Sequence, residues 1–295
     1  MPRRSSAALS VCWAIILACA GERAAAVNDG PCAVRITPET ASVAVVRLAT
    51  EDVELSGVFT CSAAVIAPNL VLTAAHCVSR QAPGPFDCDE GNGWSLDEDG
   101  SGRGRLGDVY PAEAVSVRRP TAEGAFERVA GAERVIAFGA PTRCADNLAL
   151  VVLDQALDIE PLPLRLESST REGEGLLLSG FAPFGSARRS AALTVTHVAA
   201  ELSSVDAPAG ALRLEGGACN SDLGGAIYSP ATGALVALPF APSEGDCEAP
   251  GAQSIALELS RYAQFIRRVA EDAGAALHGE AAPEAPLGDD HCTAP

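Results

Sequence analysis

The chain has 295 residues, of which 48% are hydrophobic and 20% are charged, and every one of its 21 cationic side chains is Arg. This length and apolar content provide for a sizeable core and exclude intrinsic disorder over most of the chain. The formal net charge of −17 argues against nucleic acid as a partner, because phosphates require a basic surface. No apolar run reaches the roughly 18 residues of a transmembrane helix, so no transmembrane span is expected.

The first 26 residues have the three-part pattern of a secretory signal peptide. Arg3 and Arg4 form a positive start, residues 7–18 are apolar, and residues 24–26 are small. We therefore predict a signal peptide over residues 1–26 and a secreted or cell-envelope protein. A buried N-terminal helix is the alternative. Residues 16–19 also resemble a bacterial lipobox, although with an unusual Leu, which would place a lipid anchor on Cys19.

Short β-branched or alternating segments recur along the chain, separated by Gly, Pro, Asn and Asp. They predict strands at residues 42–48, 71–74, 148–153, 176–179, 192–198, 234–238 and 254–259. Many short strands with turn residues between them favour an all-β barrel or sandwich. One helix is expected late in the chain, where four apolar residues recur at helical spacing: Tyr262, Phe265, Ile266 and Val269.

Two segments break this pattern. Residues 83–108 are rich in Gly and Asp and predict a long surface loop. Residues 272–295 are rich in Ala, Pro and Glu and predict a flexible tail that packs little.

Within the predicted loop, four residues have the oxygen-ligand spacing of a calcium site: Asp97, Asp99, Ser101 and Asp108. The alternative is a solvated acidic loop, because the twelfth ligand of such a site is normally Glu and no flanking helices are predicted. Calcium is therefore the one candidate metal ion, and no cofactor is required by the sequence.

The segment from Val71 to Cys77 reads Val-Leu-Thr-Ala-Ala-His-Cys. Another cysteine, Cys61, lies sixteen residues before Cys77. A strand thus ends in a His that is flanked by small residues and followed by Cys. This string resembles the catalytic His segment of the chymotrypsin/trypsin family of serine proteases, in which a disulfide of that span holds the His loop. The resemblance implies that His76 occupies the position of the catalytic His.

Further segments resemble that family in the family's own order. They are the strand of the catalytic acid at residues 147–153, the turn that opens the second barrel at 178–181, the nucleophile loop at 219–226, and a closing segment with Cys247, Pro250, Gly251 and the predicted helix. The resemblance implies an all-β fold of two antiparallel six-stranded β-barrels with a C-terminal helix. The barrels are expected over residues 27–165 and 166–271, with any active site between them.

The family's chemistry needs a Ser nucleophile, a His base and a buried Asp that orients the His. Counting from Cys219, the Ser position falls at Leu223, and the two following glycines agree with this register. Leu offers no oxygen that could attack a substrate. The family's oxyanion hole uses the backbone N–H groups at Ser221 and Leu223, and Ser221 replaces a Gly whose loss is expected to disturb the hole.

The position of the catalytic acid is ambiguous. Alignment on the family's Asp-Ile-Ala-Leu places Asn147 there, with Asp146 one residue earlier. A shift of one residue turns a strand side chain to the opposite face, so Asp146 would need a β-bulge. Asn favours the wrong tautomer of the His, at a cost of about 10⁴-fold in turnover. We favour Asn147 at this position and keep Asp146 as the alternative.

The resemblance also implies roles for two further residues, Asp222 and Gly217. A freed N-terminal Ile or Val pairs with the Asp before the nucleophile in the family, here Asp222. Arg35-Ile36 lies at a suitable distance before His76, but Thr37-Pro38 replaces the usual Gly-Gly. Gly217 would form the base of the specificity pocket. Because Gly217 carries no charge, such a pocket would not select a basic side chain of a substrate.

An exported chain without a Cys-x-x-Cys pair is expected to use its eight mature Cys in disulfides. The resemblance pairs Cys61 with Cys77 and Cys219 with Cys247. The other four Cys allow three connectivities. We favour Cys88–Cys144, because the loop after the His and the strand of the acid are neighbours in the family fold, and this choice leaves Cys32–Cys292.

These features lead to one functional hypothesis and two alternatives. The hypothesis is an exported trypsin-like protease homologue without proteolytic activity, which binds a protein or peptide ligand. The first alternative is an active serine endopeptidase that uses displaced residues such as Ser221 and Asp146. The second is a structural envelope protein in which the fold is a disulfide-linked block.

Overall fold

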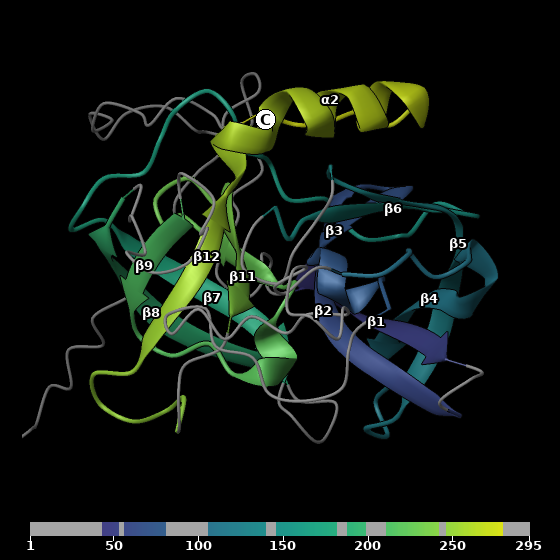
Figure 1. Ribbon diagram of the computed structural model, residues 1–295, viewed down its shortest axis with the longest axis horizontal. Helices are drawn as coiled ribbons and strands as arrows, with labels where there is room; N and C mark the ends of the chain where they lie inside the picture. Colours follow the sequence, from purple (N-terminus) through teal and green to yellow (C-terminus); the bar gives the residue numbers. More distant parts are fainter. Residues whose placement is uncertain are drawn as a thin grey trace, which may run out of the picture.

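The computed structural model describes residues 43–52, 56–80, 106–139, 146–181, 188–198, 211–241 and 246–279. These residues form two closed six-stranded antiparallel barrels, which lie side by side, the first in purple to teal and the second mostly in green (Figure 1). The expected all-β fold class and the double-barrel architecture are confirmed. Among the described residues, no helix is long and apolar enough to cross a bilayer.

The first barrel is built from the N-terminal half of the chain. Its strands are β1 (Val45–Asp52), β2 (Gly57–Ala67), β3 (Leu70–Thr73), β4 (Val115–Pro120), β5 (Phe126–Ala137) and β6 (Ala149–Leu153). Their order around the barrel is β1-β2-β3-β6-β5-β4. β3 and β6 are buried along their whole length, which explains why both appear in the sequence as continuous apolar runs.

The second barrel follows the same plan. Its strands are β7 (Gly175–Phe181), β8 (Arg188–His197), β9 (Ala211–Glu215), β10 (Ala226–Tyr228), β11 (Leu235–Ala241) and β12 (Gln253–Glu258). Their order is β10-β11-β12-β9-β8-β7. In β8, Leu193 and Val195 are buried whereas Ala192 and Thr194 are exposed, the alternation expected of a strand with one face in the core.

The two barrels pack against each other through β7 and β10 of the second and β1 and β2 of the first. Aromatic and cationic side chains fill part of this contact. The rings of Phe126 in β5 and Phe181 in β7 meet edge to face at 5.4 Å, and the Arg47 guanidinium lies 4.0 Å from the Phe126 centroid. Buried residues of both barrels therefore meet in one hydrophobic cluster, and a second cluster, which includes Leu178 and Leu212, fills the second barrel.

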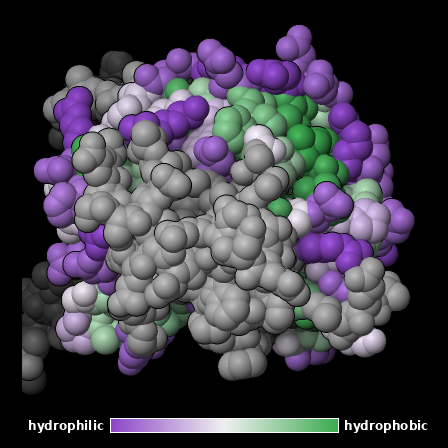
Figure 2. Space-filling model, in the orientation of Figure 1, coloured by the Kyte–Doolittle hydropathy of each residue, from purple (hydrophilic) through white to green (hydrophobic). Residues whose placement is uncertain are grey.

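The predicted C-terminal helix is confirmed as α2 (Ala263–Asp272), which follows a 3₁₀ turn, η4 (Leu259–Tyr262). Ile266 and Val269 are buried, and the ring of Phe138 contacts the rings of Tyr262 and Phe265 at 5.0 and 5.1 Å. The helix lies along the top of Figure 1 above the first barrel. Hydrophobic residues gather below it on the same face, with hydrophilic residues around the rim (Figure 2).

The chain stays packed beyond the end of α2. Ala273, Ala275 and Leu277 pack against the core. The Leu164 N–H donates to the His278 carbonyl at 2.7 Å, and Leu164 forms parallel bridges with Gly279 and Leu235. The expectation that residues 272–295 pack little is therefore wrong for residues 273–279, because backbone groups of the inter-barrel segment supply partners that composition does not reveal.

Residues 154–174 join β6 to β7, and the expected domain boundary between residues 165 and 166 falls within this segment. The predicted signal peptide over residues 1–26 and the lipid-anchor site at Cys19 lie outside the described residues.

Candidate functional site

His76 lies in a short 3₁₀ turn, η1 (Ala75–Cys77), directly after β3. Asn147 is fully buried beside it, at the entry to β6. The Asn147 Oδ1 accepts the His76 backbone N–H at 2.9 Å. The ring Nδ1 of His76 lies 3.0 Å from Asn147 Nδ2 and 3.2 Å from Oδ1. The structure therefore brings His76 and Asn147 together.

These contacts bear on the tautomer of the His76 ring. The backbone N–H of His76 donates a hydrogen bond and therefore needs an acceptor. The Asn147 side-chain atom that lies 2.9 Å from it is accordingly assigned as the amide oxygen, Oδ1. A hydrogen bond from Nδ2–H to Nδ1 would place the ring proton on Nε2, whereas a proton on Nδ1 would be directed toward Oδ1. The Nε2 atom lies 3.6 Å from Cys77 Sγ. With the ring proton on Nε2, that nitrogen is a donor and cannot take a proton from a nucleophile.

Asp146 turns away from this pair. Its φ of +50° is unusual for a residue with a side chain, and its Oδ1 accepts the Tyr262 hydroxyl at 3.2 Å. Burial raises the pKa of Tyr262, and the neighbouring Asp146 carboxylate raises it further. The structure therefore uses Asp146 to tie the start of β6 to the C-terminal segment.

The loop of residues 219–225 contains a 3₁₀ turn, η3 (Asn220–Asp222), followed by Leu223. The side chain of Leu223 is buried, with 4% exposure. Gly224 has φ +80°, and a Cβ there would lie 2.4 Å from both the Ser62 carbonyl oxygen and Thr73 Oγ1. The loop is thereby held against the end of β3, near the turn that carries His76.

Ser62 of β2 is the residue that joins this loop to both barrels. Its backbone N–H donates to the Leu223 carbonyl at 3.0 Å, and its hydroxyl donates to the Ser221 carbonyl at 2.7 Å. The same hydroxyl oxygen accepts the Phe181 N–H at 3.2 Å. Sequence reasoning missed Ser62; its one signal is its place directly after Cys61.

Asp222 lies beneath the loop with its side chain fully buried. Its Oδ2 accepts the Arg189 guanidinium at 2.6 Å and the Cys219 N–H at 2.8 Å, whereas Oδ1 has no hydrogen-bond partner in the part of the chain that the structure describes. Burial raises the pKa of Asp222, and the Cys219 N–H and Arg189 oppose this without cancelling it. Arg189 was not anticipated from the sequence, where it appears only as half of an Arg pair.

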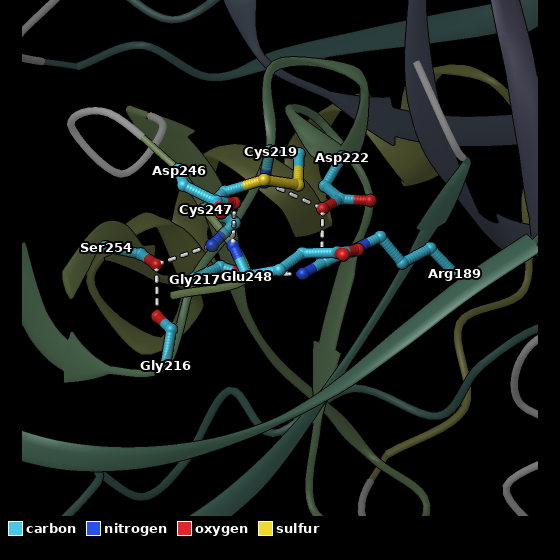
Figure 3. The surroundings of a disulfide bond; sticks show 10 residues. Arg189, Gly216, Gly217, Cys219, Asp222, Asp246, Cys247, Glu248 and Ser254 are labelled. Carbon is cyan, nitrogen blue, oxygen red and sulfur yellow. Dashed lines mark hydrogen bonds and ion pairs between the residues drawn. A yellow bond between two sulfur atoms is a disulfide. The ribbon is translucent and has the colours of Figure 1, made fainter. Parts of the chain in front are cut away.

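Gly217 does not provide an open pocket base. A Cβ at this position would lie 1.6 Å from the Cys247 carbonyl oxygen, so the Cys247 backbone rests directly on Gly217. The Gly217 carbonyl also accepts the Arg189 guanidinium at 3.1 Å. The space around Gly217 is thus filled by groups of the chain itself (Figure 3).

Two disulfides expected from the resemblance are formed, Cys61–Cys77 and Cys219–Cys247. The first stands beside His76, and the second closes the segment over Gly217 (Figure 3). The remaining expected disulfide residues lie outside the described residues: Cys32, Cys88, Cys144 and Cys292.

The candidate calcium site is largely outside the described residues, which include Asp108 but not Asp97, Asp99 or Ser101. Calcium binding therefore stays a prediction. Among the described residues, one group has three metal-ligating side chains close together, formed by Cys61, His76 and Cys77. Both thiols of that group are consumed in the disulfide, so it does not fit a metal ion.

The double barrel, the His-Cys turn and the disulfide-closed loop together define the chymotrypsin-like class of protein. Residues 61–238 match the family described as trypsin-like peptidase domain. This match covers more than half of the chain, and the protein belongs to that family. No curated protein sequence is significantly similar to it.

Solved structures show the same fold at low sequence identity. The chain is similar to the HtrA-type protease AlgW with tripeptide, at 16% identity and a TM-score of 0.52, over 80% of this chain and 63% of that chain. It is also similar to the scabies mite inactivated protease paralogue S-I1, at 18% identity and a TM-score of 0.54, over 79% of this chain and 96% of that chain. The chain thus spans less than two thirds of the length of AlgW, and the likeness establishes the fold.

Proposed function

We propose that this protein is an exported trypsin-like protease homologue without proteolytic activity, which acts by binding a protein or peptide ligand. The observation that carries the proposal is the buried, apolar side chain of Leu223 in the nucleophile loop. Covalent catalysis in this family requires an oxygen nucleophile activated by a base, and Leu223 supplies none.

The surroundings of Leu223 support the same conclusion. The contact between Asn147 Nδ2 and His76 Nδ1 favours a ring whose Nε2 is protonated and therefore no base. The Cys247 carbonyl lies against Gly217, the position that the family resemblance assigns to the base of the specificity pocket. Nucleophile, base and specificity pocket are thus each altered, although the fold around them is intact.

The contacts of Asp146 and Ser221 argue against an active endopeptidase built from them. Asp146 binds the Tyr262 hydroxyl, so its carboxylate is engaged away from His76. The Ser221 hydroxyl is buried without a hydrogen-bond partner among the described residues, whereas a serine nucleophile needs a neighbouring base.

Export is supported by the disulfides Cys61–Cys77 and Cys219–Cys247, because such bonds persist in oxidising compartments. A binding role is supported by the retained loop architecture around Ser62, which keeps both barrels in contact with the segment that carries Leu223.

The absence of a nucleophile is tested with a fluorophosphonate probe, which labels activated serines. We expect no labelling of the native protein, and labelling at any Ser would contradict the proposal. The variant Leu223→Ser with Ser221→Gly and Asn147→Asp restores the three family residues and is expected to react. Leu223→Ser alone is the matched control and should stay unreactive, because His76 keeps Asn147 as its partner.

Binding is tested by capture from the native exported fraction. A stoichiometric protein or peptide that is retained by the folded protein, and not by the reduced and unfolded protein, would support a binding role. Recovery of the protein alone would instead support the structural envelope role.

A further inference from the structure

The buried carboxylate of Asp222 has an internal cation. Arg189 of β8 places Nη1 2.6 Å from Asp222 Oδ2, Nη2 3.1 Å from the Gly217 carbonyl and Nε 3.3 Å from Glu248 Oε1. Figure 3 shows the guanidinium between these groups, beneath the Cys219–Cys247 disulfide. One side chain thus contacts the nucleophile loop, the segment before it and the segment that follows Cys247.

The strand pair β7–β8 sets this geometry. Arg189 lies opposite Gly180 of β7 in the antiparallel register, and residues opposite each other share a face of the sheet. Gly180 has no side chain on that face, and a Cβ there would lie 2.3 Å from Asp222 Oδ1. Asp222 therefore occupies the space over Gly180, directly beside Arg189.

The ion pair is shielded from water. The Asp222 side chain is fully buried and that of Arg189 is 13% exposed. Removal of one member of a buried ion pair leaves an uncompensated charge in the interior, which is strongly unfavourable. Loss of either charge is therefore expected to destabilise this arrangement of the loop.

We propose that Arg189 is the positioning residue that holds the loop of residues 219–225 in its folded conformation in the uncleaved chain, so that no freed N-terminal ammonium is needed to pair with Asp222. The guanidinium supplies the positive charge and, with the Gly217 carbonyl, also ties the loop to the Cys247 segment. Thr37-Pro38 after Ile36 agrees with this, because the sequence does not retain the family's usual Gly-Gly there. The inference goes beyond the proposed function, since it concerns the loop whether or not the protein hydrolyses a substrate.

The test is hydrogen exchange at the amides of Asp222, Gly224 and Gly225, which donate hydrogen bonds within and around the loop. In Arg189→Ala we expect these amides to exchange at least tenfold faster than in the native protein. Ethylguanidinium at millimolar concentration should restore their protection by refilling the vacated position. Arg188→Ala is the matched control: the Arg188 guanidinium donates to the carbonyls of Val43 and Val45 and contacts the Phe181 ring, so ethylguanidinium should not protect the loop in that variant.

Three further variants keep the test decisive if Arg189→Ala folds poorly. Arg189→Lys retains a cation and should keep most of the protection. Arg189→Met combined with Asp222→Asn removes both charges and should exchange more slowly at the loop than Arg189→Met alone. Unchanged exchange in Arg189→Ala, or equal effects of ethylguanidinium on both Ala variants, would overturn the proposal.

The role of the N-terminus is tested with two otherwise identical proteins that begin at Val27 and at Ile36. We expect the same loop protection in both, because Arg189 already neutralises Asp222. Greater protection in the protein that begins at Ile36 would show that a freed terminus organises the loop and would refute the proposal.

Discussion

Three glycines of the second barrel are required by close contacts rather than by turns alone. Gly180 lies against Asp222, Gly224 lies against Ser62 and Thr73 of the first barrel, and Gly225 lies against the Ser179 carbonyl. The family resemblance assigns the two glycines after Leu223 to the nucleophile loop, but their pattern does not reveal which atoms they contact. At the residue scale, the loop is thus built around contacts that exclude side chains.

Gly180→Ala should destabilise the protein by about 1–3 kcal/mol, because overpacking of a well-packed interior carries a cost of that order. The new Cβ would lie 2.3 Å from Asp222 Oδ1 and 2.7 Å from its Cα. Gly175→Ala in the same strand is the control, since no atom lies within 4 Å of its Cβ position. Urea unfolding measures both, and equal midpoints would contradict the contact.

Asp222 makes stability depend on pH. Burial raises its pKa above the reference of 3.8, helped slightly by Glu248 and opposed by the Cys219 N–H and Arg189. The folded protein therefore binds this proton more tightly than the unfolded chain does. The stability that this group contributes is fully present below the unfolded pKa and is lost as pH rises through the folded pKa.

The free energy of unfolding of the native protein, relative to that of Asp222→Asn, should consequently decrease as pH rises from about 3 to 7. Denaturant titrations at several pH values measure this difference. Glu271→Gln, at an exposed position of α2, is the control for the removal of one carboxylate from the protein. A difference for Asp222→Asn that stays constant or increases with pH would be inconsistent with a raised pKa.

At the scale of the secondary-structure elements, every strand that the sequence predicts is present, but β2, β4, β5, β9 and β10 were not predicted. β5 contains four charged residues among its twelve, and β10 has only three residues. Their pairing with neighbouring strands, rather than their own hydrophobic pattern, makes them strands. The helix was predicted because its buried positions recur at helical spacing on one face.

The segment after α2 provides a prediction at this scale. A chain that ends at Asp272 should be less stable than one that ends at Gly279 by roughly 1–3 kcal/mol. The shorter chain loses the hydrogen bond from Leu164 to His278 and the packing of Leu277. Thermal unfolding of the two truncated chains isolates residues 273–279, and equal midpoints would show that this segment contributes nothing.

At the scale of the whole molecule, the barrels are coupled through the loop of residues 219–225. The Ser62 hydroxyl links the Ser221 carbonyl and the Phe181 N–H, and its own backbone N–H binds the Leu223 carbonyl. The loop belongs to the second barrel in sequence but is held by a strand of the first. A single cooperative unfolding transition is expected for the two barrels.

Ser62→Ala should destabilise the protein by about 1–3 kcal/mol, because it leaves buried polar partners of the hydroxyl unpaired. Ser116→Ala, also buried but bonded at 3.5 Å to Ala49 within the first barrel, should cost less. Denaturant unfolding followed by fluorescence and by circular dichroism measures both variants. If Ser62→Ala were no more destabilising than Ser116→Ala, the proposed coupling would be absent.

The sequence by itself determined the resemblance to the trypsin-like family, because that resemblance depends on short motifs that can be recognised locally and that occur in the family's order. The resemblance in turn implied the double-barrel fold, the pairing of four Cys and the assignment of Leu223 to the nucleophile position. Only the tertiary structure decided that Asn147 and not Asp146 contacts His76. It also revealed the pairing of Arg189 with Asp222 and the contact between Ser62 and Ser221, which are 159 residues apart. Such contacts depend on the register of strands that are distant in the chain, and no local pattern encodes that register.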